Sequence, residues 1–83
     1  MKILVLGTGC TNCRRAAAVL EEAVRRLGSD ARVEKIEDIL EIMKYDVMSL
    51  PAVVVDGEVV FSGGVPDAAR AEEIVKAADR LEG

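Results

Sequence analysis

The chain has 83 residues, a net charge of −4, 51% apolar residues, two aromatic residues and no histidine. This apolar content is typical of a folded domain, which we expect to span residues 1–83 with an aliphatic core. The absence of histidine excludes Ser-His and Cys-His catalysis and imidazole ligation of metals. A negative charge without a basic stripe argues against nucleic acid, and no apolar run approaches the ~20 residues of a membrane span. No secretory leader pattern opens the sequence, so we expect a cytoplasmic protein with no membrane partner.

Residues 2–6 form a nearly continuous apolar run, which predicts a central strand buried on both faces. Glycines at both ends of residues 7–9 follow, and then a Cys-x-x-Cys motif that holds the only two cysteines, Cys10 and Cys13. The unpaired N–H groups and partial positive charge of a helix N-terminus stabilise a thiolate there. A disulfide across so short a loop removes little entropy from the unfolded chain. The pair therefore indicates a redox couple rather than a structural staple.

After the motif, apolar residues recur at helical spacing and charged residues fill the opposite face, which predicts an amphipathic helix. Glu21 with Arg25, and Glu22 with Arg26, are i,i+4 pairs in the favoured order. We expect Gly28 to end this helix in the left-handed conformation.

Residues 31–36 alternate imperfectly and carry several charges, which favours an exposed edge strand. Residues 37–45 predict a short helix or helical turn. Its apolar residues Ile39, Ile42 and Met43 are expected on one side.

Residues 52–61 contain two apolar runs joined by Asp56-Gly57, the signature of a hairpin with a type I′ turn. Residues 62–66 then predict a turn, and Asp67 can cap a final amphipathic helix. The predicted order is β-α-β-(α)-β-β-α. A right-handed crossover makes the first two strands parallel and the hairpin adds two antiparallel ones, so we expect an α/β fold with a four-stranded mixed sheet between helices.

Three segments stand out: Gly-x-Gly-Cys-x-x-Cys at residues 7–13, Met-Ser-Leu-Pro-Ala-Val-Val-Val-Asp-Gly at residues 48–57, and Ser-Gly-Gly-Val-Pro before the final helix. Through them the chain resembles the thioredoxin superfamily, especially its small archaeal and bacterial glutaredoxin-sized redox-active disulfide proteins. The resemblance implies a minimal thioredoxin fold and a thiol–disulfide oxidoreductase, or electron carrier, that acts on protein disulfides. It also implies a cis peptide bond at Leu50–Pro51, with Pro51 beside the cysteines and the Leu50 backbone hydrogen-bonding an extended substrate.

The same resemblance implies that Cys10 is the exposed nucleophile and that Cys13 is the buried resolving thiol. Cys10 would form a mixed disulfide with the substrate, and Cys13 would then release the reduced product. Arg14 and Arg15 add positive charge nearby. We expect a monomer that needs a reductase partner, without cofactor or bound metal. The buried acid that thioredoxins place beneath their cysteines has no counterpart in the first strand, which leaves the proton acceptor for Cys13 unassigned.

Other functions stay open beside this one. Heavy-metal-associated domains also carry Cys-x-x-Cys after their first strand but end in a strand, whereas a final helix is predicted here. A dimer could bring four cysteines together around zinc or an iron–sulfur cluster. A redox-switched interaction domain is a third alternative. Glutathione is a further candidate partner, because Gly63, Gly64 and Asp67 loosely match the Gly-Gly-acid motif of glutaredoxins, although Pro66 interrupts it.

Overall fold

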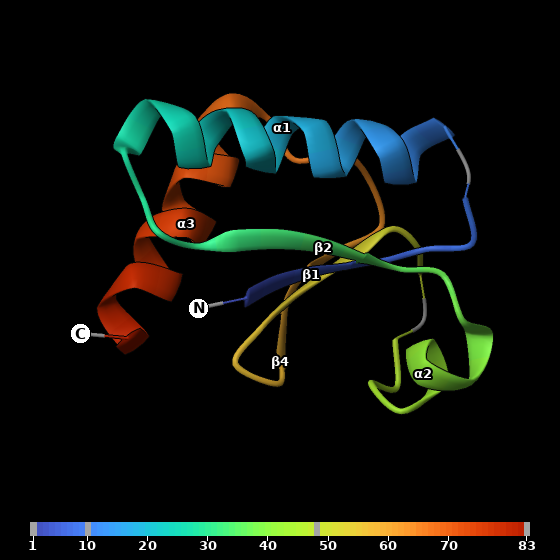
Figure 1. Ribbon diagram of the computed structural model, residues 1–83. Helices are drawn as coiled ribbons and strands as arrows, with labels where there is room; N and C mark the ends of the chain where they lie inside the picture. Colours follow the sequence, from blue (N-terminus) through green and yellow to red (C-terminus); the bar gives the residue numbers. More distant parts are fainter. Residues whose placement is uncertain (1, 10, 48, 83) are drawn as a thin grey trace.

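The computed structural model describes residues 2–9, 11–47 and 49–82, with the backbone alone for residues 81 and 82. Along them the elements follow in the order β1 (Lys2–Leu6), α1 (Thr11–Leu27), β2 (Arg32–Ile36), α2 (Ile39–Met43), β3 (Ala52–Val55), β4 (Glu58–Ser62) and α3 (Ala68–Glu82). The strands form one mixed sheet, with α1 and α3 on one face and α2 on the other (Figure 1). The predicted α/β fold and element order are confirmed.

The first strand, β1, lies inside the sheet, as predicted. In the described residues the strand order is β2-β1-β3-β4, with β1 parallel to β2 and antiparallel to β3. Strand β4 pairs with β3 in a hairpin and forms one edge of the sheet, while β2 forms the other. The carboxyl end of β1 therefore meets the start of β3, because those two strands run in opposite directions.

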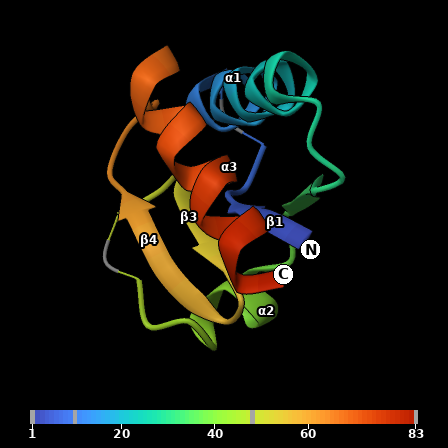
Figure 2. The same ribbon diagram turned by 90° about the vertical axis from the view of Figure 1, so that its left-hand side faces the viewer.

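An apolar core lies on each face of the sheet because side chains alternate along β1. Ile3 and Val5 face the larger core beneath α1 and α3, where Leu20 is fully buried. Leu6 faces the smaller core, in which Ile42 is the buried contribution of α2. Figure 2 shows α1 and α3 side by side on the same side of the sheet.

Helix α1 ends as predicted at a left-handed glycine. Gly28 has φ +62°, and the Ser29 N–H donates to the carbonyl of Val24 at 3.0 Å. This closing hydrogen bond is that of a Schellman motif, which satisfies a carbonyl of the last helical turn.

The charged face of α1 is paired differently from the prediction. Glu22 contacts Arg26 at 3.7 Å, as expected, but it also contacts Arg25 at 2.6 Å. Arg25 thus pairs with Glu22, three residues away, instead of with Glu21. Positions i+3 and i+4 flank the same patch of helix surface, so one carboxylate can meet both guanidinium groups.

Helix α2 buries only part of its apolar side. Asp38 caps it by accepting the Leu40 N–H at 2.9 Å. Ile42 is 3% exposed, but Ile39 and Met43 are 52% and 68% exposed. The three side chains lie on one side of α2, as predicted, since all of them line one hollow. Only Ile42 is buried, because a helix of five residues touches the sheet over little more than one position.

The hairpin and the final helix follow their sequence signals. Asp56 and Gly57 have φ +54° and +79°, as a type I′ turn requires at both central positions. Asp67 caps α3 through its Oδ1, which accepts the Arg70 N–H at 2.8 Å. Both local predictions are confirmed.

Candidate functional site

The candidate site lies where β1 ends and α1 begins. Cys10, the predicted nucleophile, lies outside the described residues. Cys13 occupies the first turn of α1 and is 4% exposed, on the side of the helix that faces the sheet. Its burial agrees with the character that the resemblance implied for it, and its role as resolving thiol stays a prediction.

Gly7 allows the end of β1 to approach the Cys13 side chain closely. A Cβ atom at position 7 would collide with the Cys13 Sγ and would lie 2.9 Å from the Cys13 Cβ. The Gly7 N–H also donates to the Ile36 carbonyl at 3.0 Å, which continues the pairing of β1 with β2. Only glycine leaves space for the sulfur while the backbone stays in register with β2.

A small cavity of about 100 Å³ opens beside the Cys13 side chain. Its lining consists of Val5, Gly7, Gly9, Cys13, Arg14, Lys35 and Glu37. A polar cavity of this size has room for water next to the sulfur. Charged side chains and the buried thiol therefore line the same cavity.

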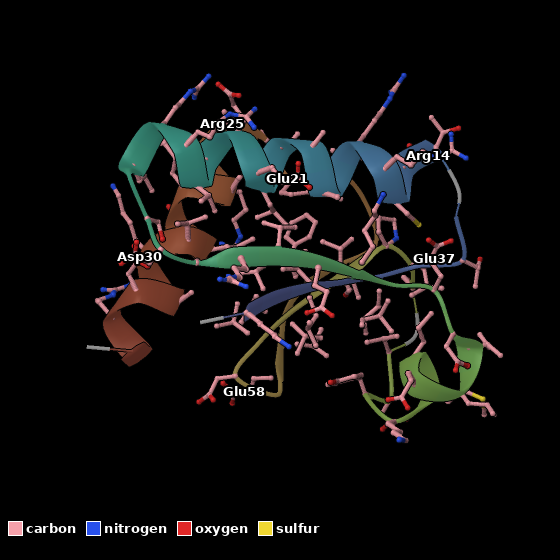
Figure 3. The ribbon with its side chains drawn as sticks, viewed as in Figure 1. Arg14, Glu21, Arg25, Asp30, Glu37 and Glu58 are labelled. Atoms are coloured by element: carbon pink, nitrogen blue, oxygen red, sulfur yellow. The ribbon has the colours of Figure 1, made fainter. Side chains whose placement is uncertain are left out.

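Sequence reasoning missed Lys35 and Glu37, which it placed only in an exposed edge strand and in a helical turn. Side chains two residues apart face the same side of a strand, so both follow Val33 toward the α1 face. The Oε2 of Glu37 lies 3.2 Å from the position of a Cβ atom at Gly9. Figure 3 shows Glu37 directly beneath Arg14, at the start of α1. The period of two, counted onward from Val33, was the signal that could have found them.

The Leu50–Pro51 peptide bond is cis, as the resemblance implied. Pro51 is fully buried, and its carbonyl accepts the Gly63 N–H at 3.0 Å. Because Leu6 pairs with Ala52 in the antiparallel register, Pro51 comes next at the level of Gly7. The structure therefore brings Pro51 to the strand end that Cys13 packs against, although Pro51 and the Cys-x-x-Cys motif are some forty residues apart in sequence.

Gly63 and Asp67, which the sequence suggested as glutathione contacts, make hydrogen bonds within the fold. The Asp67 carboxylate caps α3, and Gly63, at φ +85°, donates its N–H to Pro51. These interactions explain the loose match to the Gly-Gly-acid motif without a ligand.

Two absences hold for the part of the chain that the structure describes. In residues 2–9, 11–47 and 49–82, no group of three or more Cys, Asp or Glu side chains is placed to hold a metal ion. The helices in these ranges are also too short or too polar to cross a bilayer.

Comparison with known proteins identifies the family. A family model described as thioredoxin domain matches residues 1–76. A thioredoxin of Methanothermobacter thermautotrophicus is 43% identical over 76 residues, which cover 92% of this chain and 95% of that protein. A thioredoxin of Methanocaldococcus jannaschii is 35% identical over 74 residues, with 89% and 85% covered. The chain belongs to the thioredoxin family.

Solved structures confirm the fold. Chloroplastic thioredoxin z matches with a TM-score of 0.63 and 21% identity, over 95% of this chain and 78% of that one. The oxidised thioredoxin of Plasmodium falciparum matches with a TM-score of 0.63 and 19% identity, over 94% and 80%. Family membership makes this protein, in general terms, a thiol–disulfide oxidoreductase, a class whose members act on protein disulfides together with a reductase partner.

Proposed function

We propose that this protein reduces protein disulfides with Cys10 and Cys13 as its dithiol/disulfide couple. The observation that carries the proposal is the placement of the Cys13 thiol, which is buried against Gly7 at the strand end that Pro51 also reaches. A strand end, a helix start and a buried proline thus lie close to Cys13.

The reaction is a pair of thiol–disulfide exchanges. The Cys10 thiolate attacks one sulfur of the substrate disulfide, forms a mixed disulfide and releases the other sulfur as a thiolate that takes up a proton. The Cys13 thiol loses its proton and attacks the Cys10 sulfur, which breaks the mixed disulfide and releases the second substrate thiol. The substrate gains two electrons and two protons, and the Cys10–Cys13 disulfide must then be reduced by a partner protein.

Substrate binding in this proposal uses the segment before β3. Leu50 is 36% exposed and directly precedes the buried Pro51, so its backbone can pair with an extended substrate chain. The buried proline holds this backbone beside the strand end where Cys13 packs.

The cellular location, the domain organisation and the oligomeric state are part of the same proposal. A reductase works where thiols stay reduced, which supports a cytoplasmic location. We also propose that residues 1–83 act as one thioredoxin-like domain and as a monomer, without cofactor or bound metal. The structural tasks of Gly63 and Asp67 weaken the case for glutathione as the electron donor.

The test is substrate trapping together with redox titration. The Cys13→Ser variant should hold substrates on Cys10 as mixed disulfides in a cell extract, whereas the matched Cys10→Ser variant should hold none. We expect the couple to titrate near −270 mV, which is typical of a reductase, and a value near −120 mV would indicate a disulfide-forming protein instead. An empty trap, or stoichiometric metal in anaerobically purified protein without reductase activity, would overturn the proposal.

A further inference from the structure

A hollow of about 600 Å³ lies between helix α3 and the edge strand β4. Figure 2 shows β4 at the edge of the sheet and α3 across the face of the sheet. The apolar part of the lining is Val60 from β4 with Ile74 and Ala77 from α3. The charged part comes from α3 alone and consists of Arg70, Glu73, Lys76 and Arg80. We call these seven residues the α3–β4 groove. It shares no lining residue with the Cys13 cavity, so it is a separate feature of the surface.

The α3–β4 groove is positively charged on a protein that is negative overall. Its lining carries +2, whereas the whole chain carries −4. Its one carboxylate, Glu73, lies 3.4 Å from Arg70. Lys76 and Arg80 form no hydrogen bond or ion pair within the part of the chain that the structure describes. Figure 3 shows Glu58 at the hairpin end of the sheet, and it does not line the groove. The charges of Lys76 and Arg80 are therefore available to a partner.

Two other carboxylates of α3 are directed toward α1 instead of the groove. Glu72 contacts Arg26 of α1 at 3.5 Å. The Asp79 carboxylate accepts the hydroxyl of Ser29, just after α1, at 2.6 Å. Helix α3 thus separates its charges, with these anions on one side and its three cations at the groove. Such a surface is electrostatically complementary to an acidic partner.

The positions of the cations favour a chain over a small anion as the ligand. Arg70 is held in place, because its guanidinium lies 5.8 Å from the centre of the Phe61 ring and 3.4 Å from the Val60 carbonyl oxygen. A side chain that is already held loses less conformational entropy on binding. Helix α3 rises about 15 Å from Arg70 to Arg80. Cations spread over this length can pair with several carboxylates of one segment.

An added strand is a poor occupant of the same edge. The pairing of β4 with β3 shifts register between Val53 and Val54, which marks a β-bulge, and Arg70 covers the Val60 carbonyl. Bulges and charged side chains at an edge strand both hinder pairing with a further strand. A second copy of this chain also fits poorly, because a symmetric contact would bring two cationic grooves together.

We propose that the α3–β4 groove binds an acidic segment of a partner protein. An apolar side chain of that segment enters the groove over Ile74 and Ala77, and neighbouring Asp or Glu residues pair with Lys76 and Arg80. A volume of about 600 Å³ is within the range of pockets that hold ligand groups. The inference goes beyond the proposed function, since the groove contains no cysteine and is separate from the Cys13 cavity.

Binding of a defined peptide tests the groove without any redox chemistry. The probe is a short fluorescent peptide in which leucines alternate with pairs of glutamates, and its binding is followed by fluorescence anisotropy. A peptide with lysine for glutamate loses the ion pairs, and one with serine for leucine loses the apolar contact. Each should bind at least about tenfold more weakly than the probe. High salt should weaken binding of the probe. Equal binding of either control peptide would overturn the inference.

Variants of the protein locate the binding site. Arg80→Glu should weaken binding of the probe at least about tenfold, because it replaces an attraction with a repulsion. Arg32→Glu is the matched control, since it changes the net charge equally at an exposed position of β2, on the opposite edge of the sheet. It should change binding by less than about twofold. Ala77→Gln puts a polar side chain into the groove and keeps a good helix former, so it should weaken binding about tenfold. Equal losses in Arg80→Glu and Arg32→Glu, or no loss in Arg80→Glu and Ala77→Gln, would overturn the inference.

Reduction of hydroxyethyl disulfide separates the groove from the proposed redox site. Its kcat/KM should be the same in wild type, Arg80→Glu and Ala77→Gln, because this small substrate has no acidic segment. A joint loss of activity and peptide binding in both groove variants would assign their effect to the fold as a whole and overturn the inference. If the wild type does not reduce this disulfide, the proposed function is in question, while peptide binding still decides the role of the groove. Self-association that Arg80→Glu abolishes would assign the groove to a second copy of the chain and overturn the inference.

Discussion

Gly7 shows how one residue can decide the geometry of a site. The space that its missing side chain leaves is filled by the Cys13 Sγ. The sequence indicated residues 7–9 as a strand-to-helix junction, but nothing local distinguishes Gly7 from its neighbour Gly9. The need for glycine arises from a contact between two elements.

A Gly7→Ala variant tests this contact. The added methyl group must displace either the Cys13 side chain or the end of β1, so we expect the free energy of unfolding to fall by about 1–3 kcal/mol. Urea denaturation measures it. Gly64→Ala is the matched control, since no atom lies within 4 Å of a Cβ there, and it should change stability by less than about 0.5 kcal/mol. Equal stability of the two variants would contradict the proposed packing.

The charges at the Cys13 cavity lead to a pair of predictions with opposite signs. Lys35 and Glu37 both line this cavity, and a cation favours the thiolate of Cys13 whereas an anion opposes it. With Lys35→Met, the pH midpoint for resolution of a preformed mixed disulfide on Cys10 should move to higher pH. With Glu37→Gln it should move to lower pH, because the variant removes a negative charge from the lining of the cavity.

Rapid mixing of the mixed disulfide across a pH series measures both midpoints. Lys76→Met on α3, which does not line this cavity, is the control. Shifts of the same sign in both variants would show that Lys35 and Glu37 do not act electrostatically on the thiol. If Glu37 instead accepts the Cys13 proton, Glu37→Gln should resolve the mixed disulfide more slowly without a shift of the pH midpoint. Lys35→Met should still shift the midpoint to higher pH.

At the scale of the element, the ion pairs on the surface of α1 depend on the positions of the side chains as well as on their spacing in the sequence. Glu22 forms ion pairs with both arginines of the last turn. The hydrogen bond and charge of Arg25, followed by the charge of Arg26, lower the pKa of Glu22. The sequence predicted two separate pairs because i+3 and i+4 partners are equivalent by spacing alone.

Glu22→Gln should therefore lower stability at neutral pH more than Glu21→Gln does. A carboxylate whose pKa is depressed in the folded state stabilises it above the unfolded pKa, and this contribution disappears as the pH falls through the folded value. Thermal unfolding at neutral and at acidic pH measures the effect. The difference between the two variants should vanish in acid, and its persistence there would assign it to helix propensity instead of charge.

Helix α2 demonstrates the limit of a periodicity argument at the same scale. Its apolar spacing predicted that Ile39, Ile42 and Met43 share one side, which they do, but spacing does not tell that one short turn against the sheet buries Ile42 alone and leaves Ile39 and Met43 exposed. The longer helices α1 and α3 each bury several apolar side chains because they cross the sheet over several turns.

At the scale of the whole molecule, two cores of unequal size hold the sheet between its helices. The larger one lies under α1 and α3, and the smaller one lies under α2 beside the candidate site. Helix α1 is also tied to α3 at its far end, where the Ser29 hydroxyl donates to Asp79 at 2.6 Å.

Leu20→Ala should therefore destabilise the whole molecule, not only α1. Leu20 is fully buried in the larger core, and its truncation to alanine typically costs about 2–5 kcal/mol, a large share of the stability of a small domain. Leu40→Ala, on an exposed position, should change stability by less than about 0.5 kcal/mol. Denaturant unfolding followed by circular dichroism compares them, and a similar midpoint for both would contradict the assigned core.

The sequence by itself determined the order of the elements, the left-handed end of α1, the hairpin turn and the cap of α3. Each depends on residues only a few positions apart, so local spacing and backbone preference are sufficient. Family resemblance added the cis bond before Pro51, which backbone preference alone would not have predicted.

The tertiary structure alone decided which residues surround Cys13. Gly7, Lys35 and Glu37 meet at its cavity because β1 and β2 pair in parallel register beneath the start of α1, and this register is set by packing over the whole sheet. The same holds for the exposed apolar side chains of α2, since the burial of a side chain depends on what the rest of the chain places over it.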